Sequence, residues 1–117
     1  MKILRLTLKK KWFDLILSGE KLEDYRTDKP FWASRLCDKN GQAKKDFDLV
    51  ECKNGYGKNV PTIYREFKEI TMAELHPPKH GEEKLGFKAT DFAIVMGEKV
   101  DYVEPKKEDE LLNFGGF

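Results

Sequence analysis

Cysteine and histidine are scarce in this chain, which has two of each among its 117 residues. Cys37 and Cys52 lack the Cys-x2-Cys spacing of a zinc knuckle. His76 and His80 are separated by a segment with two prolines, which excludes the regular helix that would place both imidazoles on one face. We therefore expect no metal site and no cofactor, and we expect the two cysteines to be reduced thiols.

Long apolar runs are also missing, because no stretch approaches the roughly 18 residues that a membrane-spanning helix needs. The chain begins with the charged residues Lys2 and Arg5 and not with the apolar pattern of a signal peptide. These absences predict a cytoplasmic protein without a membrane partner. In that compartment a disulfide is not expected, and a monomer is the expected state.

A strong net charge is the third absence, since 22 Lys and Arg residues nearly balance 21 Asp and Glu residues. The whole-chain charge therefore does not indicate a nucleic-acid-binding protein. The charges are unevenly distributed, however: residues 1–45 contain 12 basic and 6 acidic residues, and residues 46–117 contain 10 and 15. The basic half is either a phosphate-binding surface or a set of solvated lysines.

The length and the 39% hydrophobic content fit a single domain that buries its own core, with no room for a second domain. We assign this domain to residues 1–104. Residues 105–117 follow as a charged C-terminal tail, because the acidic and basic run that opens it is too charged to pack.

Apolar periodicity places the first two elements. Alternating leucines predict a strand over residues 3–8 with the leucines facing inward. A helical period over residues 12–17 predicts the main helix, which ends at Gly19, where glycine adopts a positive φ at no steric cost.

Three lysines, Lys9, Lys10 and Lys11, fall in the first turn of this helix, where the helix dipole disfavours cations. Lys10 and Lys11 can pair with Asp14, which would offset part of that cost. Alternatively, the three lysines and the exposed backbone N–H groups form a phosphate-binding corner.

The next strand begins near Leu22, and period-2 alternation turns Asp24 and Arg26 inward with it. Glu23 and Tyr25 then face outward. Two opposite charges on a half-buried face are costly unless they meet each other or a ligand. We therefore expect chemistry at this strand.

The remaining elements follow from turn signals. A proline and a cap candidate predict a short helix over residues 31–36. An Asn-Gly turn predicts a hairpin between strands at 47–52 and 60–70. A long exposed loop over residues 71–90 precedes a buried strand at 92–96.

Residues 19–26 read Gly-Glu-Lys-Leu-Glu-Asp-Tyr-Arg and resemble the Gly-x-Lys-x-x-Glu-x-Arg signature of the ASCH family. Gly19, Lys21 and Arg26 match it, and Asp24 stands where glutamate is usual. The flanking stretches 6–19, 29–32 and 54–56 also resemble that family.

The resemblance implies a fold of the α+β class: a small mixed PUA-like β-barrel of about five or six strands, with one main helix between the first two strands and a second short helix. It also implies RNA, a nucleotide or a nucleoside as the partner. Some relatives are nucleoside amidohydrolases, whose site contains a lysine, a threonine and a glutamate, and others are ribonucleases. The threonine position of the amidohydrolase is Asp24 here, which argues against that activity.

Our leading hypothesis is an RNA- or nucleotide-binding cleft at the mouth of the barrel, because lysine and arginine meet phosphates, Asp and Asn read base edges, and aromatic rings stack on bases. The expected ligand-binding residues are Lys21, Asp24, Arg26, Trp32, Arg35, Asn54 and Tyr56. Trp32 could instead fill the core, and Tyr56 could fold back over the end of the barrel.

The alternative is a hydrolase in which Lys21 is the nucleophile or general base and Asp24 positions it or carries the proton. A second carboxylate would help, and Glu74 from the long loop is one source. However, Asp24 beside Lys21 would raise the lysine pKa, which opposes this role. A third reading is a structural or protein-binding barrel, in which Asp24 and Arg26 pair only with each other.

Overall fold

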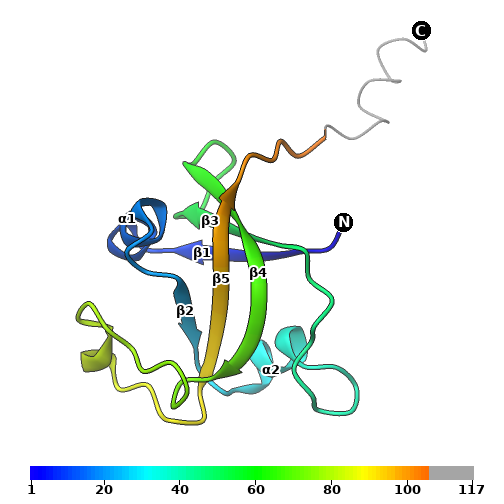
Figure 1. Ribbon diagram of the computed structural model, residues 1–117, viewed down its shortest axis with the longest axis vertical. Coiled ribbons are helices and arrows are strands. Elements are labelled where there is room, and N and C mark those ends of the chain that lie inside the picture. Colours follow the sequence, from blue (N-terminus) through cyan, green and yellow to red (C-terminus); the bar gives the residue numbers. More distant parts are fainter. Residues whose placement is uncertain (106–117) are drawn as a thin grey trace, which may run out of the picture.

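The computed structural model describes residues 1–105, which form one curled five-stranded sheet with two α-helices (Figure 1). The strands are β1 (Ile3–Leu8), β2 (Glu23–Arg26), β3 (Leu49–Asn54), β4 (Thr62–Met72) and β5 (Phe92–Val100). Their order across the sheet is β1-β3-β4-β5-β2. Strands β1 and β3 are parallel, and the other neighbours are antiparallel. The sheet curls into a half-barrel with β1 and β2 as its edges.

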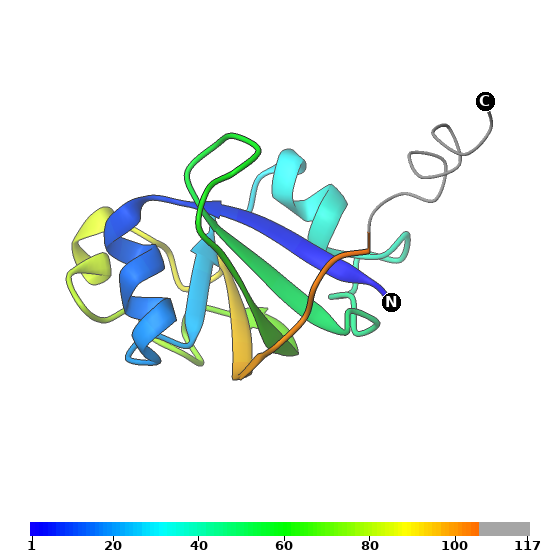
Figure 2. The same ribbon diagram turned by 90° about the horizontal axis from the view of Figure 1, so that it is seen from above.

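Helix α1 (Lys10–Ser18) joins the two edge strands, and helix α2 (Pro30–Leu36) follows β2. The long segment between β4 and β5, which we call the 73–91 loop, contains a 3-10 turn, η1 (Glu82–Leu85). In Figure 2 this loop lies next to α1 at one end of the half-barrel. The predicted α+β class, with a main helix between the first two strands and a short second helix, is confirmed.

The core fills the hollow of the half-barrel. The predicted leucine face of β1 is confirmed, because Leu4, Leu6 and Leu8 are all buried. Helix α1 adds Phe13 and Ile16, and the central strands contribute further buried residues. One inward stripe on α1 is enough to fix the helix against the sheet, since a buried side chain of this size stabilises the fold by about 1.5–3 kcal/mol.

The end of α1 is fixed by two features that also position the start of β2. Gly19 has φ +86°, as predicted, and its N–H donates to the carbonyl of Ile16. The buried Arg65 of β4 donates to the same carbonyl from Nε and Nη2, at 3.0 and 2.8 Å. Because the chain turns here, Lys21 and the residues after it enter the sheet directly beside α1.

The prediction that Tyr25 faces solvent is wrong. Asp24 and Tyr25 point to opposite faces of β2, yet both are buried. The outer face is covered by the 73–91 loop, which packs Phe87 and Ala73 against the Tyr25 ring. Alternation predicts which face a side chain takes, but a long loop can bury the second face as well.

No helix within residues 1–105 is both long and apolar enough to cross a membrane. The tail predicted for residues 105–117 lies, after Pro105, outside the described residues.

Candidate functional site

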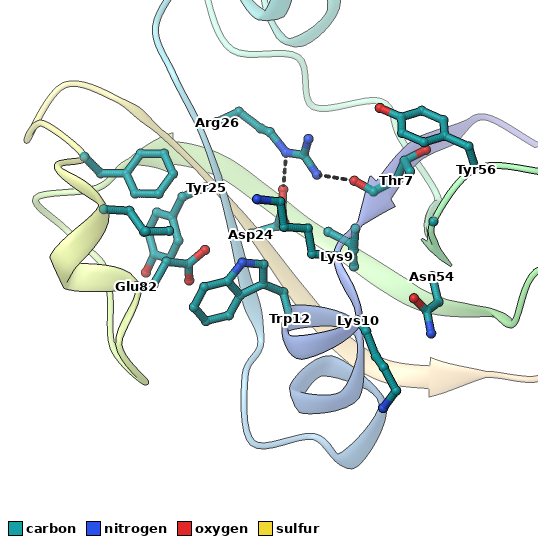
Figure 3. A pocket seen from close by; sticks show the side chains of 14 residues that line it. Thr7, Lys9, Lys10, Trp12, Asp24, Tyr25, Arg26, Asn54, Tyr56 and Glu82 are labelled. Atoms are coloured by element: carbon teal, nitrogen blue, oxygen red, sulfur yellow. Dashed lines mark hydrogen bonds and ion pairs between the residues drawn. The ribbon is translucent and has the colours of Figure 1, made fainter.

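A cavity of about 540 Å³ lies where the edge strands meet the start of α1 (Figure 3). Its walls are the end of β1, the first turn of α1, strand β2, the turn after β3 and the 73–91 loop. We call it the site cavity, and its lining residues are the 14 drawn in Figure 3. It is the space left between the two edges of the half-barrel, which are not paired with each other.

Two of the predicted residues, Asp24 and Arg26, lie together in the wall of the site cavity. Arg26 Nε donates to Asp24 Oδ2 at 2.6 Å, and Arg26 Nη2 donates to the carbonyl of Thr7 at 3.1 Å (Figure 3). Asp24 is buried, and Arg26 is partly exposed. Arg26 therefore bridges β2 to β1 across the gap between the edge strands while one side of its guanidinium group faces the cavity.

Lys21 is not in the wall of the cavity but buried behind it, so the expectation of an open cleft that includes Lys21 is not met. Its ammonium group donates to the carbonyl of Glu23 and lies 3.1 Å from Glu82 Oε1. The rings of Trp12 and Tyr25 lie 5.8 and 5.4 Å from Nζ. The physical reason is the 73–91 loop, which closes over the turn after α1 and supplies a carboxylate to the buried cation.

Glu82, which the sequence analysis missed, is the second carboxylate of the site. It is buried and lines the cavity beside Trp12 and Tyr25 (Figure 3). Within the described residues no hydrogen bond of favourable geometry reaches its Oε1 atom, although Lys21 Nζ is close. Burial raises the pKa of Glu82, and the charge of Lys21 offsets part of that shift.

Glu74, the carboxylate suggested from the sequence, is exposed, and the carboxylate that pairs with Lys21 is Glu82. The only local signal for Glu82 is its flanking glycines, Gly81 and Gly86, both of which adopt a positive φ and bound the 3-10 turn. That pattern predicts a turn but not which of its acidic residues points inward.

Tyr25 connects the 73–91 loop to β2. Its hydroxyl donates to the carbonyl of His76, and its ring packs against Phe87 at 5.6 Å between ring centres. Burial, followed by the charge of Glu23, raises the pKa of this hydroxyl well above its ordinary value. Tyr25 therefore stays neutral at physiological pH and serves as a fixed donor.

The opposite end of the cavity is formed by the turn after β3. Asn54 and Tyr56, both predicted, line the cavity there, on the far side from Glu82 (Figure 3). The Tyr56 side chain is 90% exposed, so it does not fold back over the end of the barrel. This exposed ring stands at the rim of the cavity.

The first turn of α1 adds cations to the cavity wall. Lys9 and Lys10 line it, and Lys10 makes the predicted pair with Asp14, at 2.6 Å. Lys11 does not pair with Asp14 and instead lies over the Trp12 ring at 4.7 Å. The N–H groups of Trp12 and Phe13 donate to the carbonyl of Lys9, so the N–H groups that precede them are the ones without helical acceptors, as at any helix start.

Trp32 and Arg35, which were also predicted, do not line the cavity. Trp32 is half-buried on α2 and contacts the Arg26 guanidinium group at 4.6 Å from the ring centre. Arg35 is exposed and lies over the ring of Phe31. Helix α2 begins four residues after β2, and its Leu36 and Trp32 pack with the buried core of the half-barrel, which keeps Trp32 out of the cavity wall.

Within residues 1–105 no three His, Cys, Asp or Glu side chains lie close enough together to hold a metal ion. Cys37 and Cys52 are both free thiols.

Comparison with known proteins gives no match to a family model, to a curated protein or to a solved structure.

Proposed function

We propose that this chain binds RNA, or a nucleotide or nucleoside, in the site cavity, as an ASCH domain of the PUA-like superfamily. The observation that carries the proposal is the composition of the cavity wall. The cations Lys9, Lys10 and Arg26 share it with the exposed ring of Tyr56 and the amide of Asn54. These are the groups that bind phosphate, stack on a base and read a base edge.

Charge also supports an anionic ligand. Asp24 is occupied by Arg26, and Glu82 faces the buried cation Lys21, so neither carboxylate is left without a nearby cation. Lys9 remains exposed at the rim, and the first turn of α1 presents backbone N–H groups beside it. A phosphate group at this position would gain from both, which favours a ligand with at least one phosphate.

The resemblance of residues 19–26 to the ASCH signature supports the same ligand class from an independent direction. In this proposal Lys21 supports the site from behind instead of touching the ligand. Asp24 and Arg26 form one wall, and Asn54 and Tyr56 form the other.

The proposal is tested by calorimetric titration with AMP and with the RNA hexaadenylate. At least one should bind, more weakly as salt increases. Lys9→Glu should lower the affinity by about tenfold or more, because it places a negative charge where a phosphate would bind. The control is Lys99→Glu, an equal charge change at an exposed lysine of β5 that does not line the cavity. Absence of binding by both ligands, or equal effects of the two variants, would overturn the proposal.

A hydrolase is the alternative, and the arrangement of Lys21 and Glu82 favours it. A carboxyl group whose pKa is raised by burial can carry a proton, and Glu82 both contacts the lysine and lines the cavity. Against it, Lys21 is held by its carboxylate partner and is buried away from the ligand space. Release of the carboxylic acid from an N-acylated nucleoside, lost in Glu82→Gln, would favour the hydrolase over simple binding.

A further inference from the structure

Cations and aromatic rings continue from the site cavity onto α2 in an unbroken series of contacts. Arg26 lines the cavity, and its guanidinium carbon lies 4.6 Å from the centre of the Trp32 ring. Trp32 packs edge-on against Phe31, with 5.2 Å between ring centres. Arg35 in turn lies 3.7 Å from the Phe31 ring and donates to the Phe31 carbonyl. We call Arg26, Trp32, Phe31 and Arg35 the α2 stack.

The far end of the α2 stack is open to solvent. Phe31 is 57% exposed, whereas Leu36 on the same helix is fully buried. Helix α2 contains no acidic residue, and Lys29 precedes it directly. This surface therefore combines an exposed ring with the positive charges of Lys29 and Arg35, which can contact a phosphate backbone.

Helix α2 and the loop that contains Tyr56 project from one side of the sheet, although Figure 1 shows them apart along the long axis of the molecule. Figure 2 shows α2 and the 55–61 loop rising from one side of the sheet. Tyr56 lies at the rim of the site cavity, at the end opposite Glu82, and its ring is almost fully exposed. Because Arg26 both lines the cavity and contacts Trp32, a chain that leaves the cavity over Arg26 meets Trp32 and then Phe31.

We infer that the ligand is a single-stranded polynucleotide, and that Phe31 and Arg35 bind nucleotides next to the one in the site cavity. This inference rests on the proposed function and deepens it from a nucleotide-sized ligand to a strand. Bases of any sequence stack on exposed rings and on guanidinium planes, and lysines and arginines follow the phosphates between them. A single nucleotide in the cavity is too short to reach the exposed end of the α2 stack as well.

The test compares the affinities of AMP and the RNA hexaadenylate for the intact chain by calorimetric titration. Hexaadenylate should bind at least about tenfold more tightly than AMP, because stacking on one further ring is worth that much. In the double variant Phe31→Ala/Arg35→Ala the hexaadenylate affinity should fall by about tenfold, while the AMP affinity stays unchanged. The single variant Arg35→Glu should also weaken hexaadenylate binding, and it leaves the apolar packing of α2 intact.

The matched control is Leu75→Ala/Lys99→Ala, which removes an exposed apolar side chain and an exposed cation away from the α2 stack. It should bind both ligands like the unmodified chain. AMP binding with no gain for hexaadenylate, or full hexaadenylate affinity in the α2 variants, overturns the inference and leaves the proposed function standing. Absence of binding by both ligands overturns the proposed function and the inference together.

Discussion

Lys21 and Glu82 are the two charged side chains whose pairing closes the 73–91 loop onto the start of β2. Both side chains are at most 5% exposed, and Nζ lies 3.1 Å from Oε1. Burying two charges is expensive, and their attraction offsets that cost only when the pair is intact. The contribution of each residue to stability therefore depends on the other.

Removing one member of this pair should reveal that dependence. At neutral pH Lys21→Met should lower the free energy of unfolding by about 3–5 kcal/mol, because it leaves Glu82 buried without its cation. The double variant Lys21→Met/Glu82→Gln should recover about 1–3 kcal/mol of that loss. The measurement is a double-mutant cycle: urea midpoints are compared for the unmodified chain, Lys21→Met, Glu82→Gln and the double variant. Additive effects, within about 0.5 kcal/mol, would show that the two side chains are not coupled.

The same pair gives a pH dependence whose sign follows from the raised pKa of Glu82. A carboxyl group with a folded-state pKa above its ordinary value of 4.5 binds its proton more tightly in the folded state. The stability that protonation of Glu82 contributes is therefore complete at a pH below 4.5, and it is lost as the pH rises through the raised pKa of the folded state. In Lys21→Met the loss of stability should therefore be smallest at acidic pH, where Glu82 is neutral.

For single residues, the sequence predicts an ion pair within one strand but not an ion pair between distant segments. The proximity of Asp24 and Arg26 follows from alternation along one strand, because i and i+2 side chains share a face. The Lys21–Glu82 pair joins residues 61 positions apart in the sequence through a loop whose path no periodicity specifies. The same loop buries Tyr25, so the burial of Tyr25 could not be predicted from the sequence either.

Among the elements, α1 depends on a side chain from another strand for its C-terminal end. The buried guanidinium group of Arg65 on β4 donates to the carbonyl of Ile16 through Nε and Nη2, and to the carbonyl of Gly97 through Nη1. A cation at the C-terminal end of a helix also meets the negative end of its dipole. Arg65 thus links α1, β4 and β5 behind the site cavity.

Arg65→Met should lower the free energy of unfolding by about 3 kcal/mol, because the buried carbonyl of Ile16 and the partly buried carbonyl of Gly97 lose charge-assisted hydrogen bonds. Arg65→Lys should recover only part of this loss, since an ammonium group cannot reproduce the fork of the guanidinium group. Lys99 faces Arg65 in the β4–β5 register and is exposed, so Lys99→Met is the control and should change stability by less than about 0.5 kcal/mol. A urea midpoint of Arg65→Met close to that of the control would refute this role.

The strands and helices themselves were largely predictable, because each has a local signal. Alternating leucines place β1, and Pro30 at the first position of α2 fits the proline preference at helix starts. The order of the sheet was not predictable, since β2 pairs with β5, which lies some 70 residues later in the chain. Non-local pairing depends on the packing of the whole sheet, and no window of sequence contains it.

In the whole molecule, Cys52 on β3 lies in the core of the half-barrel, between the edge strand β1 and the central strand β4. Cys52 is fully buried, pairs with Leu6 of β1 on one side and Ile63 of β4 on the other, and contacts Met96 of β5. Burial raises the pKa of its thiol to about 12, with a smaller effect from the charge of Asp24. Cys37 lies at the surface beyond α2 and is only partly buried.

Thiol modification should therefore separate surface opening from global unfolding. With a disulfide reagent at mildly alkaline pH, Cys37 should react first, because thiolate reactivity needs exposure. Cys52 should react only when the sheet opens, and its rate should rise with urea along the same slope as global unfolding. In Cys37→Ser the fast phase should disappear and the slow phase remain. If the reaction rate of Cys52 does not depend on urea, the reagent reaches β3 through a local opening of an edge strand. The half-barrel would then not unfold as a single cooperative unit.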